Sequence, residues 1–239
     1  MQITTKAIVL SSIKYSEADL IVKCFTQTSG LKSYLLKNIL KSKKGKLHTS
    51  LFQPLTLLEL TANHKDKGTL EFMQEAKVYH TYQSLHTQIQ KTSLALFLSE
   101  ILKSVIQEEE KNEALFSFLE NSFVWLDGND AIANFHLLFL IQLSDYLGFY
   151  PDSNAINLPV FNLVDGIFQK ESTNMYCINI PDHSGIKQCF GIKFDALNTI
   201  KLSKTKRVES LEILLLYYQL HMQGFKRPKS LDVLNQLFN

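Results

Sequence analysis

The sequence has little arginine and little cysteine. Only two arginines occur among its 239 residues, Arg207 and Arg227, so bidentate guanidinium contacts are not its main means of recognition. The three cysteines, Cys24, Cys177 and Cys189, are odd in number and widely spaced. This spacing gives no disulfide framework and fits a reducing compartment.

Long apolar runs and common catalytic motifs are also missing. Apolar runs such as 137–141 and 213–218 are too short to span a bilayer, and the N-terminus lacks the continuous apolar segment of a targeting signal. The sequence contains no G-x-x-x-x-G-K-[ST] phosphate loop, no G-x-S-x-G elbow and no H-E-x-x-H helix. We therefore expect a cytoplasmic protein that is not an enzyme and needs no cofactor.

Positive charge is concentrated near the N-terminus, although the whole chain has a formal charge of only +2. Residues 1–80 contain twelve lysines and six carboxylates, whereas the remainder contains thirteen basic and seventeen acidic residues. Such an asymmetry predicts a polyanionic partner for the first part of the chain.

Residues 1–80 also have the pattern of short strands separated by turns. Strand-like composition occupies five segments, roughly 3–13, 20–26, 31–37, 52–61 and 69–79. Turn-forming stretches stand between them, such as YSEAD after the first segment and TSG after the second. Five short strands in about 80 residues fit a small barrel, and this pattern is typical of both OB-folds and SH3-like barrels.

After residue 80 the apolar spacing becomes helical. It predicts helices near 94–105, 115–125, 135–146 and 211–218, and a short last helix with Ser230 as its N-cap. Residues 151–195 are irregular, with strand-like pieces at 160–164 and 176–180. The sequence thus predicts an α+β protein, with a barrel domain at 1–80 and an α-helical domain at 81–239. The helical domain carries a small β and loop insert at about 155–198.

Several stretches, taken in order, carry a family resemblance. They are KAIVLSSIKYSEADLIVKCFTQTSGLKSYLLKNILKSKK, LFQPLTLLEL, LSDYLGFYPD, FNLVDGIF and the ending KSLDVLNQLF. The most specific parts are the Y-S-E-A-D turn with the T-x-x-x-G turn that follows it, and the K-S-L-D-V-L ending. Over nearly its whole length the chain resembles the RecO family of bacterial recombination-repair mediators.

The resemblance implies an N-terminal OB-fold, a helical domain and a small insert. It further implies a DNA repair and recombination mediator that binds single- and double-stranded DNA and anneals strands coated by single-strand-binding protein. The implied protein partners are the C-terminal tail of that coat protein and RecR, with RecF and RecA as indirect partners. Such a protein is expected near the nucleoid and not at a membrane.

The candidate DNA contacts in the barrel are lysines, most of them in a loop between the third and fourth strands. They are Lys14, Lys32, Lys37, Lys41, Lys43, Lys44 and Lys46. If roughly four to six of them meet phosphates, the slope of log affinity against log salt should be about −3 to −4 for single strands. The alternative is a solvated sheet edge whose lysines oppose aggregation.

Weaker barrel candidates accompany these lysines. Lys14 in the first barrel turn, and Lys65 and Lys67 in the last, are as well explained by an ordinary surface. Tyr15, Tyr34 and Phe52 are aromatic residues that could stack on bases, but we favour them as core or strand residues.

A second basic group, KLSKTKR, lies at 201–207 and adds Lys204, Lys206 and Arg207 to the candidate DNA contacts. It would extend a DNA path onto the helical body. The alternative, slightly favoured, is ordinary charge flanking a helix. The GFKRPKS stretch near the C-terminus has the same ambiguity.

A metal site is not expected. Many relatives in the family have a zinc site with paired C-x-x-C spacings in the insert, whereas this chain offers Cys177, His183 and Cys189 singly. A three-ligand site can be imagined from these residues, but incidental cysteines explain them better, and turn hydrogen bonds or packing would then hold the insert.

Two classes of function remain open from the sequence. One is a non-enzymatic mediator whose lysine loop holds DNA. The other is a protein-interaction adaptor in which DNA contact is incidental and an apolar groove of the helical domain binds an amphipathic or acidic tail.

Overall fold

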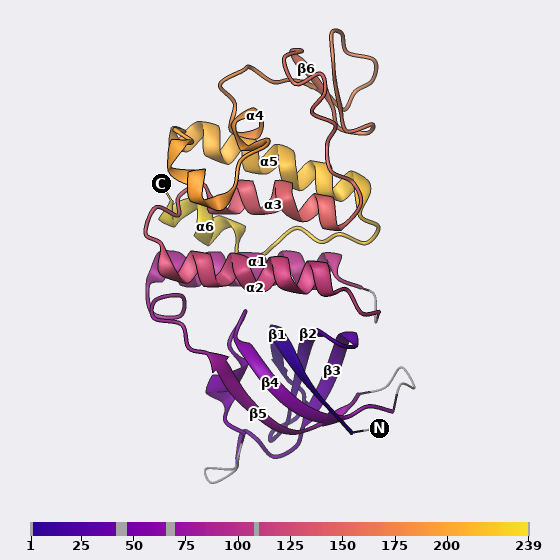
Figure 1. Cartoon of the computed structure of the whole chain (residues 1–239), viewed down its shortest axis with the longest axis vertical. Helices are drawn as coiled ribbons and strands as arrows, with labels where there is room; N and C mark the ends of the chain where they lie inside the picture. The colour runs from indigo at the N-terminus through magenta and orange to yellow at the C-terminus, as the bar shows by residue number, and fades with distance from the viewer. Residues whose placement is uncertain (1, 42–46, 66–69, 108–109, 239) are drawn as a thin grey trace. The chain divides into compact units, whose positions relative to one another are not determined.

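The computed structural model describes residues 2–41, 47–65, 70–107 and 110–238 (Figure 1). The chain forms two compact units. The first comprises residues 1–128 and 228–230, and the second comprises residues 129–227 and 231–239. The first unit thus extends beyond the barrel to residue 128. The domain boundary predicted at residue 80 stays a prediction.

The first unit contains a five-stranded antiparallel sheet in the order β3-β2-β1-β4-β5. Its strands are β1 (Gln2–Lys14), β2 (Leu20–Thr26), β3 (Gly30–Leu36), β4 (Leu57–Asn63) and β5 (Phe72–His80). The N–H of Glu71 donates to the Ser33 carbonyl at 2.8 Å, and the N–H of Leu35 donates to the Glu71 carbonyl at 2.9 Å. These hydrogen bonds join β3 to the start of β5, which closes the sheet as in an OB-type barrel. The predicted five strands and the α+β class are confirmed.

The barrel core follows from the alternation of buried and exposed residues along the strands. Ala7, Val9, Val22, Cys24 and Leu58 are fully buried in it. Tyr34 and Phe52 are 0% and 2% exposed. Both are therefore core residues and not base-stacking surfaces, as the sequence favoured.

The predicted fourth strand begins later than expected. Residues Thr49–Phe52 form a 3-10 helix, and Leu55 adopts a positive φ of 64°, so strand pairing with β5 begins only at Leu57. Pro54 has no N–H to donate to a sheet, which opposes strand formation in this stretch. The turn still contributes to the core because it carries Phe52.

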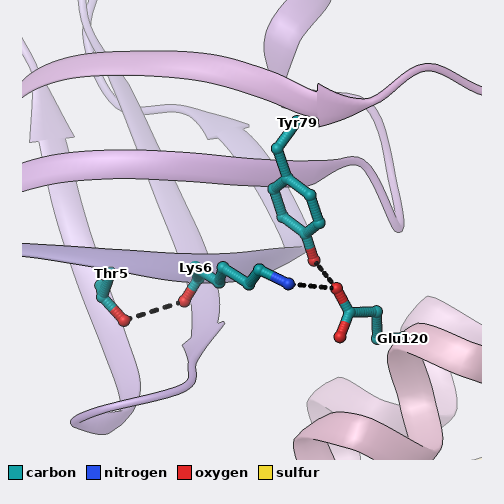
Figure 2. A network of polar contacts seen from close by, with 4 residues as sticks. All are labelled: Thr5, Lys6, Tyr79 and Glu120. Atoms are coloured by element: carbon teal, nitrogen blue, oxygen red, sulfur yellow. Dashed lines mark hydrogen bonds and ion pairs between the residues drawn. The ribbon is translucent and has the colours of Figure 1, made fainter.

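Two helices belong to the same unit as the barrel: α1 (Ile89–Val105), which packs against β1, and α2 (Glu113–Gly128). Figure 2 shows a polar contact between α2 and the barrel. The Glu120 carboxylate accepts hydrogen bonds from the Lys6 ammonium at 2.9 Å and from the Tyr79 hydroxyl at 2.7 Å. The Lys6 ammonium also lies 4.6 Å from the Tyr79 ring centroid, and the Thr5 hydroxyl donates to the Lys6 carbonyl at 3.1 Å. Lys6 is therefore engaged inside the unit.

The second unit contains the remaining helices and a small antiparallel sheet in the order β7-β6-β8. Its elements are α3 (Phe135–Tyr146), β6 (Val160–Asn162), β7 (Ile167–Gln169), β8 (Cys177–Asn179), α4 (Gly185–Cys189), the 3-10 helix Phe194–Thr199, α5 (Lys204–His221) and α6 (Leu231–Leu237). Helix α3 ends as predicted, because Gly148 adopts a positive φ of 82° and donates its N–H to the Asp145 carbonyl at 3.1 Å. The tyrosine hydroxyls of α5 hold the unit together: Tyr218 donates to the Leu140 carbonyl and Tyr217 to the Phe149 carbonyl.

Two short elements, β7 and α4, were not predicted from the apolar spacing. Each spans five residues or fewer, which is too short for a periodic pattern to be visible. Within the described ranges, none of the helices combines the length and the apolar character that crossing a membrane requires.

Candidate nucleic-acid interface

The turn after β1 and the turn after β3 are tied together by hydrogen bonds. The N–H of Asn38 donates to the Asp19 carboxylate at 2.7 Å, and the N–H of Leu40 donates to the Ala18 carbonyl at 2.9 Å. Asn38 has a positive φ of 58°, a conformation that asparagine tolerates better than most residues. The hydrogen bond from Asn38, and then one from Ser16, lowers the pKa of Asp19. The carboxylate is thus kept ionised as an anchor between the two turns.

Three of the predicted lysines are exposed in or next to these two turns. Lys14 ends β1, whereas Lys37 and Lys41 lie in the turn after β3. The Lys41 ammonium lies 3.5 Å from the Glu17 carboxylate, but both side chains are more than half exposed, at 63% and 89%. An exposed ion pair of this kind is weak and is readily exchanged for another anion.

An exposed aromatic ring lies beside two ammonium groups. The Lys37 and Lys65 ammonium nitrogens are 5.4 and 5.8 Å from the centroid of the Phe72 ring, within the range of a cation–π interaction. Phe72 is the first residue of β5, and it is 38% exposed. We call these three residues, Lys37, Lys65 and Phe72, the Phe72 cluster.

The backbone around the Phe72 cluster is firmly held. Both carboxylate oxygens of the buried Glu71 accept the N–H of Lys65, at 3.0 Å each. The neighbouring His64 ring is 2.9 Å from the Tyr34 hydroxyl, in the barrel core. The cluster is therefore built on the closure point of the barrel, where Glu71 also pairs with β3.

Other predicted barrel lysines differ in their placement. Lys32 lies in β3 opposite Cys24 and is only 7% exposed, so its burial removes it from the set that can meet a phosphate. Lys43, Lys44, Lys46 and the weaker candidate Lys67 lie outside the described residues. The exposed barrel candidates are consequently Lys14, Lys37, Lys41 and Lys65.

The second basic group lies at the start of α5, in the second unit. Ser203 caps the helix by accepting the N–H of Lys206, and Lys204 is exposed. The Arg207 guanidinium donates to the Asn134 side-chain oxygen at 2.9 Å, the Phe238 carbonyl at 2.9 Å and the Leu202 carbonyl at 3.4 Å. Arg207 therefore has a role in joining parts of its own unit, whereas Lys204 and Lys206 remain candidates for DNA contact.

The other arginine is engaged as well. The Arg227 guanidinium lies 2.5 and 2.6 Å from the two oxygens of the Glu212 carboxylate on α5. Both guanidinium groups of the chain thus have partners within the second unit. The exposed cations of the barrel are all lysines, which bind phosphates as point charges and do not read base edges by a bidentate fork.

The insert does not fit a zinc site. Across the described residues, no three or more His, Cys, Asp or Glu side chains are grouped as metal ligands would be. Burial raises the pKa of Cys189 to about 12, which opposes the thiolate form that zinc binds. The Cys177 sulfur instead accepts the N–H of Thr173 at 3.4 Å.

A buried asparagine organises the insert by hydrogen bonds. The Asn162 amide donates to the Asp165 carboxylate at 2.6 Å, and its side-chain oxygen accepts the N–H of Val164 at 3.0 Å and the side-chain amide of Asn174 at 3.3 Å. Because Asn162 is 1% exposed, these bonds compensate for its burial. Hydrogen bonds of this kind connect the turn between β6 and β7 to the loop before β8.

Phe72 was not among the residues predicted from the sequence, and Lys65 was only a weaker candidate. The available signal was the alternation of β5, in which Met73 faces the core and its neighbours Phe72 and Gln74 face outward. The cation–π geometry could not be foreseen, because Lys37 and Phe72 are brought together only by barrel closure.

Comparisons with known proteins agree with this architecture. The family model "Recombination protein O N terminal" matches residues 1–82, and "Recombination protein O C terminal" matches residues 86–232. The chain belongs to the RecO family. The resemblance noted in the sequence is thereby confirmed.

Curated relatives extend over the full chain. A protein of Christiangramia forsetii is 54% identical over 238 residues, covering 100% of both chains. A protein of Flavobacterium psychrophilum is 46% identical and covers both chains completely, and one of Porphyromonas gingivalis is 34% identical, again with complete coverage. All three are named DNA repair protein RecO. Membership of this family supports a role in DNA repair.

Proposed function

We propose that this chain is a non-enzymatic mediator of DNA repair and recombination that binds single- and double-stranded DNA. In this proposal it anneals complementary strands coated by single-strand-binding protein and assists RecA loading together with RecR. The C-terminal tail of the coat protein is its second contact, and RecF is an indirect partner. The protein acts in the cytoplasm, at the nucleoid.

The single observation that carries the proposal is the set of exposed barrel lysines, two of which lie at the closure point of the barrel. Lys37 and Lys65 lie against the exposed Phe72 ring at that point, and Lys14 and Lys41 are exposed at the end of β1 and in the turn after β3. Ammonium groups along a small barrel attract a polyanionic backbone without regard to base sequence. The names of the relatives support DNA as that polyanion.

Annealing of coated strands tests the proposal. Two complementary DNA strands are coated with the cognate single-strand-binding protein, either full length or lacking its last tail residues, and the annealing rate is measured with and without this chain. The proposal predicts acceleration only with the intact tail. Equal acceleration with the full-length and the tailless coat protein would indicate a general basic annealer that does not bind the tail. If the chain accelerates annealing with neither form, the mediator role is overturned.

A further inference from the structure

Phe72 has the surroundings of a ligand platform. A single exposed apolar residue is ordinary on a protein surface and by itself indicates nothing. Phe72 differs because two lysine ammonium groups, from separate segments of the chain, both lie within 6 Å of its ring centroid at 5.4 and 5.8 Å. The ring is 38% exposed between them.

We propose that Phe72 stacks on a nucleobase of single-stranded DNA while Lys37 and Lys65 bind the adjoining phosphates, so that the Phe72 cluster selects single strands over duplexes. This inference rests on the proposed function, which it deepens by assigning strand preference to one side chain.

The chemistry of a nucleotide matches the cluster. A base presents a flat π face to an aromatic ring, and its phosphates lie to the side. The ammonium groups of Lys37 and Lys65 lie over the Phe72 ring in the unbound chain, and their flexible side chains can move aside to reach those phosphates when a base stacks. Every base has such a face, so the contact is tolerant of sequence. In a duplex the base faces are already covered by their neighbours, so Phe72 can make this contact only with a single strand.

The cluster is also preorganised. Glu71, the residue before Phe72, holds β3 through two backbone hydrogen bonds of 2.8 and 2.9 Å. Its carboxylate fixes the backbone of Lys65 through two further contacts of 3.0 Å. Lys37 precedes Asn38, whose N–H is anchored on Asp19. Little backbone ordering is therefore required when a strand binds, which favours affinity.

The test compares one labelled oligothymidine strand with a duplex of the same length, both bound to the full chain at low salt. For Phe72→Ala, affinity for the single strand should fall about tenfold, as expected for loss of one stacked base, while duplex affinity stays within about twofold. Val78→Ala removes another exposed apolar side chain of β5 and serves as the matched control, with both affinities unchanged. Equal losses for both DNA forms, or no loss for either, would overturn the proposal.

A second variant guards against misfolding of the alanine variant. Phe72→Trp combined with Trp125→Phe leaves a single tryptophan at the cluster, because the chain has only one natural tryptophan. Its fluorescence should be quenched by oligothymidine and not by the duplex. If neither oligothymidine nor the duplex quenches the fluorescence although DNA still binds, the stacking role of Phe72 is overturned and the proposed function is not. If the unmodified chain bound neither DNA form, the proposed function would fail as well.

Discussion

The two units of this molecule use their basic residues differently. In the first unit, Lys14 is exposed at the end of β1, Lys37 and Lys41 are exposed in a turn that is fixed by backbone hydrogen bonds, and Lys65 is exposed beside Phe72 at the barrel closure. In the second unit, the Arg207 guanidinium reaches three acceptors of its own unit. A basic stretch in a sequence is therefore not equivalent to a binding surface, because the acceptors that the fold supplies decide which charges remain available.

The polar residues of the second unit confirm this contrast. Asn162 connects a short strand to the loops around it, and Arg207 joins segments that are distant in sequence. Substitutions there should act on stability, whereas substitutions among the exposed barrel lysines should act on DNA affinity.

The largest expected effect is on stability, from Arg207→Ala. Loss of charged hydrogen bonds to Asn134, Leu202 and Phe238 should lower the free energy of unfolding by about 2 to 3 kcal/mol. Chemical unfolding measures the loss, with the exposed Lys204→Ala as a neutral control. If Arg207→Ala kept full stability and lost DNA binding, Arg207 would be a DNA contact and not a structural residue of its unit.

Acid should weaken the second unit through a buried histidine. Burial, and to a smaller extent the nearby Arg207 charge, lowers the pKa of His136 to about 3. Below an unfolded pKa of about 6.5, the unfolded chain binds a proton that the folded chain does not, so stability falls with pH by up to about 1.4 kcal/mol per unit. Between pH 7 and pH 5 the loss reaches about 2 kcal/mol.

The histidine prediction is checked by urea unfolding at pH 7 and pH 5. The substitution His136→Asn removes the titrating group and should flatten the difference between the two pH values. An equally steep loss in that variant would assign the acid sensitivity to another residue.

Charge reversal in the barrel should reduce DNA affinity. Lys37→Glu combined with Lys41→Glu should weaken binding by roughly 10- to 30-fold at low salt, because two phosphate contacts become repulsive. The matched pair Lys204→Glu with Lys206→Glu, at the start of α5, should weaken it by less than about threefold. Fluorescence anisotropy with a labelled strand measures the DNA affinity of both double variants. A larger loss of affinity for the α5 pair would show that the second unit, and not the barrel, supplies the main DNA contacts.

The insert should depend on Asn162 and not on a metal. Asn162→Ala leaves buried polar partners without their bonds and should lower the free energy of unfolding by about 1 to 2 kcal/mol. A chelator should leave the melting temperature of the unmodified chain unchanged. A fall in melting temperature with chelator, restored by zinc, would show that the insert holds a metal after all.

The smallest expected effect concerns the ion pair of the first turn. Glu17→Gln removes the carboxylate 3.5 Å from the Lys41 ammonium. Because the pair is exposed, the variant should bind single strands only about twofold more tightly, and this gain should disappear at high salt. A tighter complex at every salt concentration would require a different explanation.

Much of the architecture was predictable because it depends on local pattern. The strand at 20–26 and the helix at 135–146 have the bounds predicted from alternation and helical spacing, and the turn residues YSEAD mark a real turn. The late start of β4 was missed because the 3-10 turn at Thr49–Phe52 has the composition of a strand.

The candidate interface was less predictable because it depends on which distant residues meet. Lys32 and Lys37 look alike in sequence, but the inward and outward alternation of β3 buries the first and the turn after it exposes the second. Phe72 joins Lys37 only through barrel closure, and Arg207 is engaged by acceptors from three separate segments. Such long-range partners leave no periodic signal in the sequence.

The salt dependence of single-strand binding tests whether the exposed barrel lysines hold DNA by its phosphates. The triple variant Lys37→Gln, Lys41→Gln and Lys65→Gln is compared with the unmodified chain and with Lys77→Gln, a control at an exposed lysine of β5 paired with Glu59. If the three lysines contact phosphates, the slope of log affinity against log salt should become shallower by about 2 in the triple variant and stay unchanged in the control. An unchanged slope in the triple variant would show that these lysines do not hold DNA.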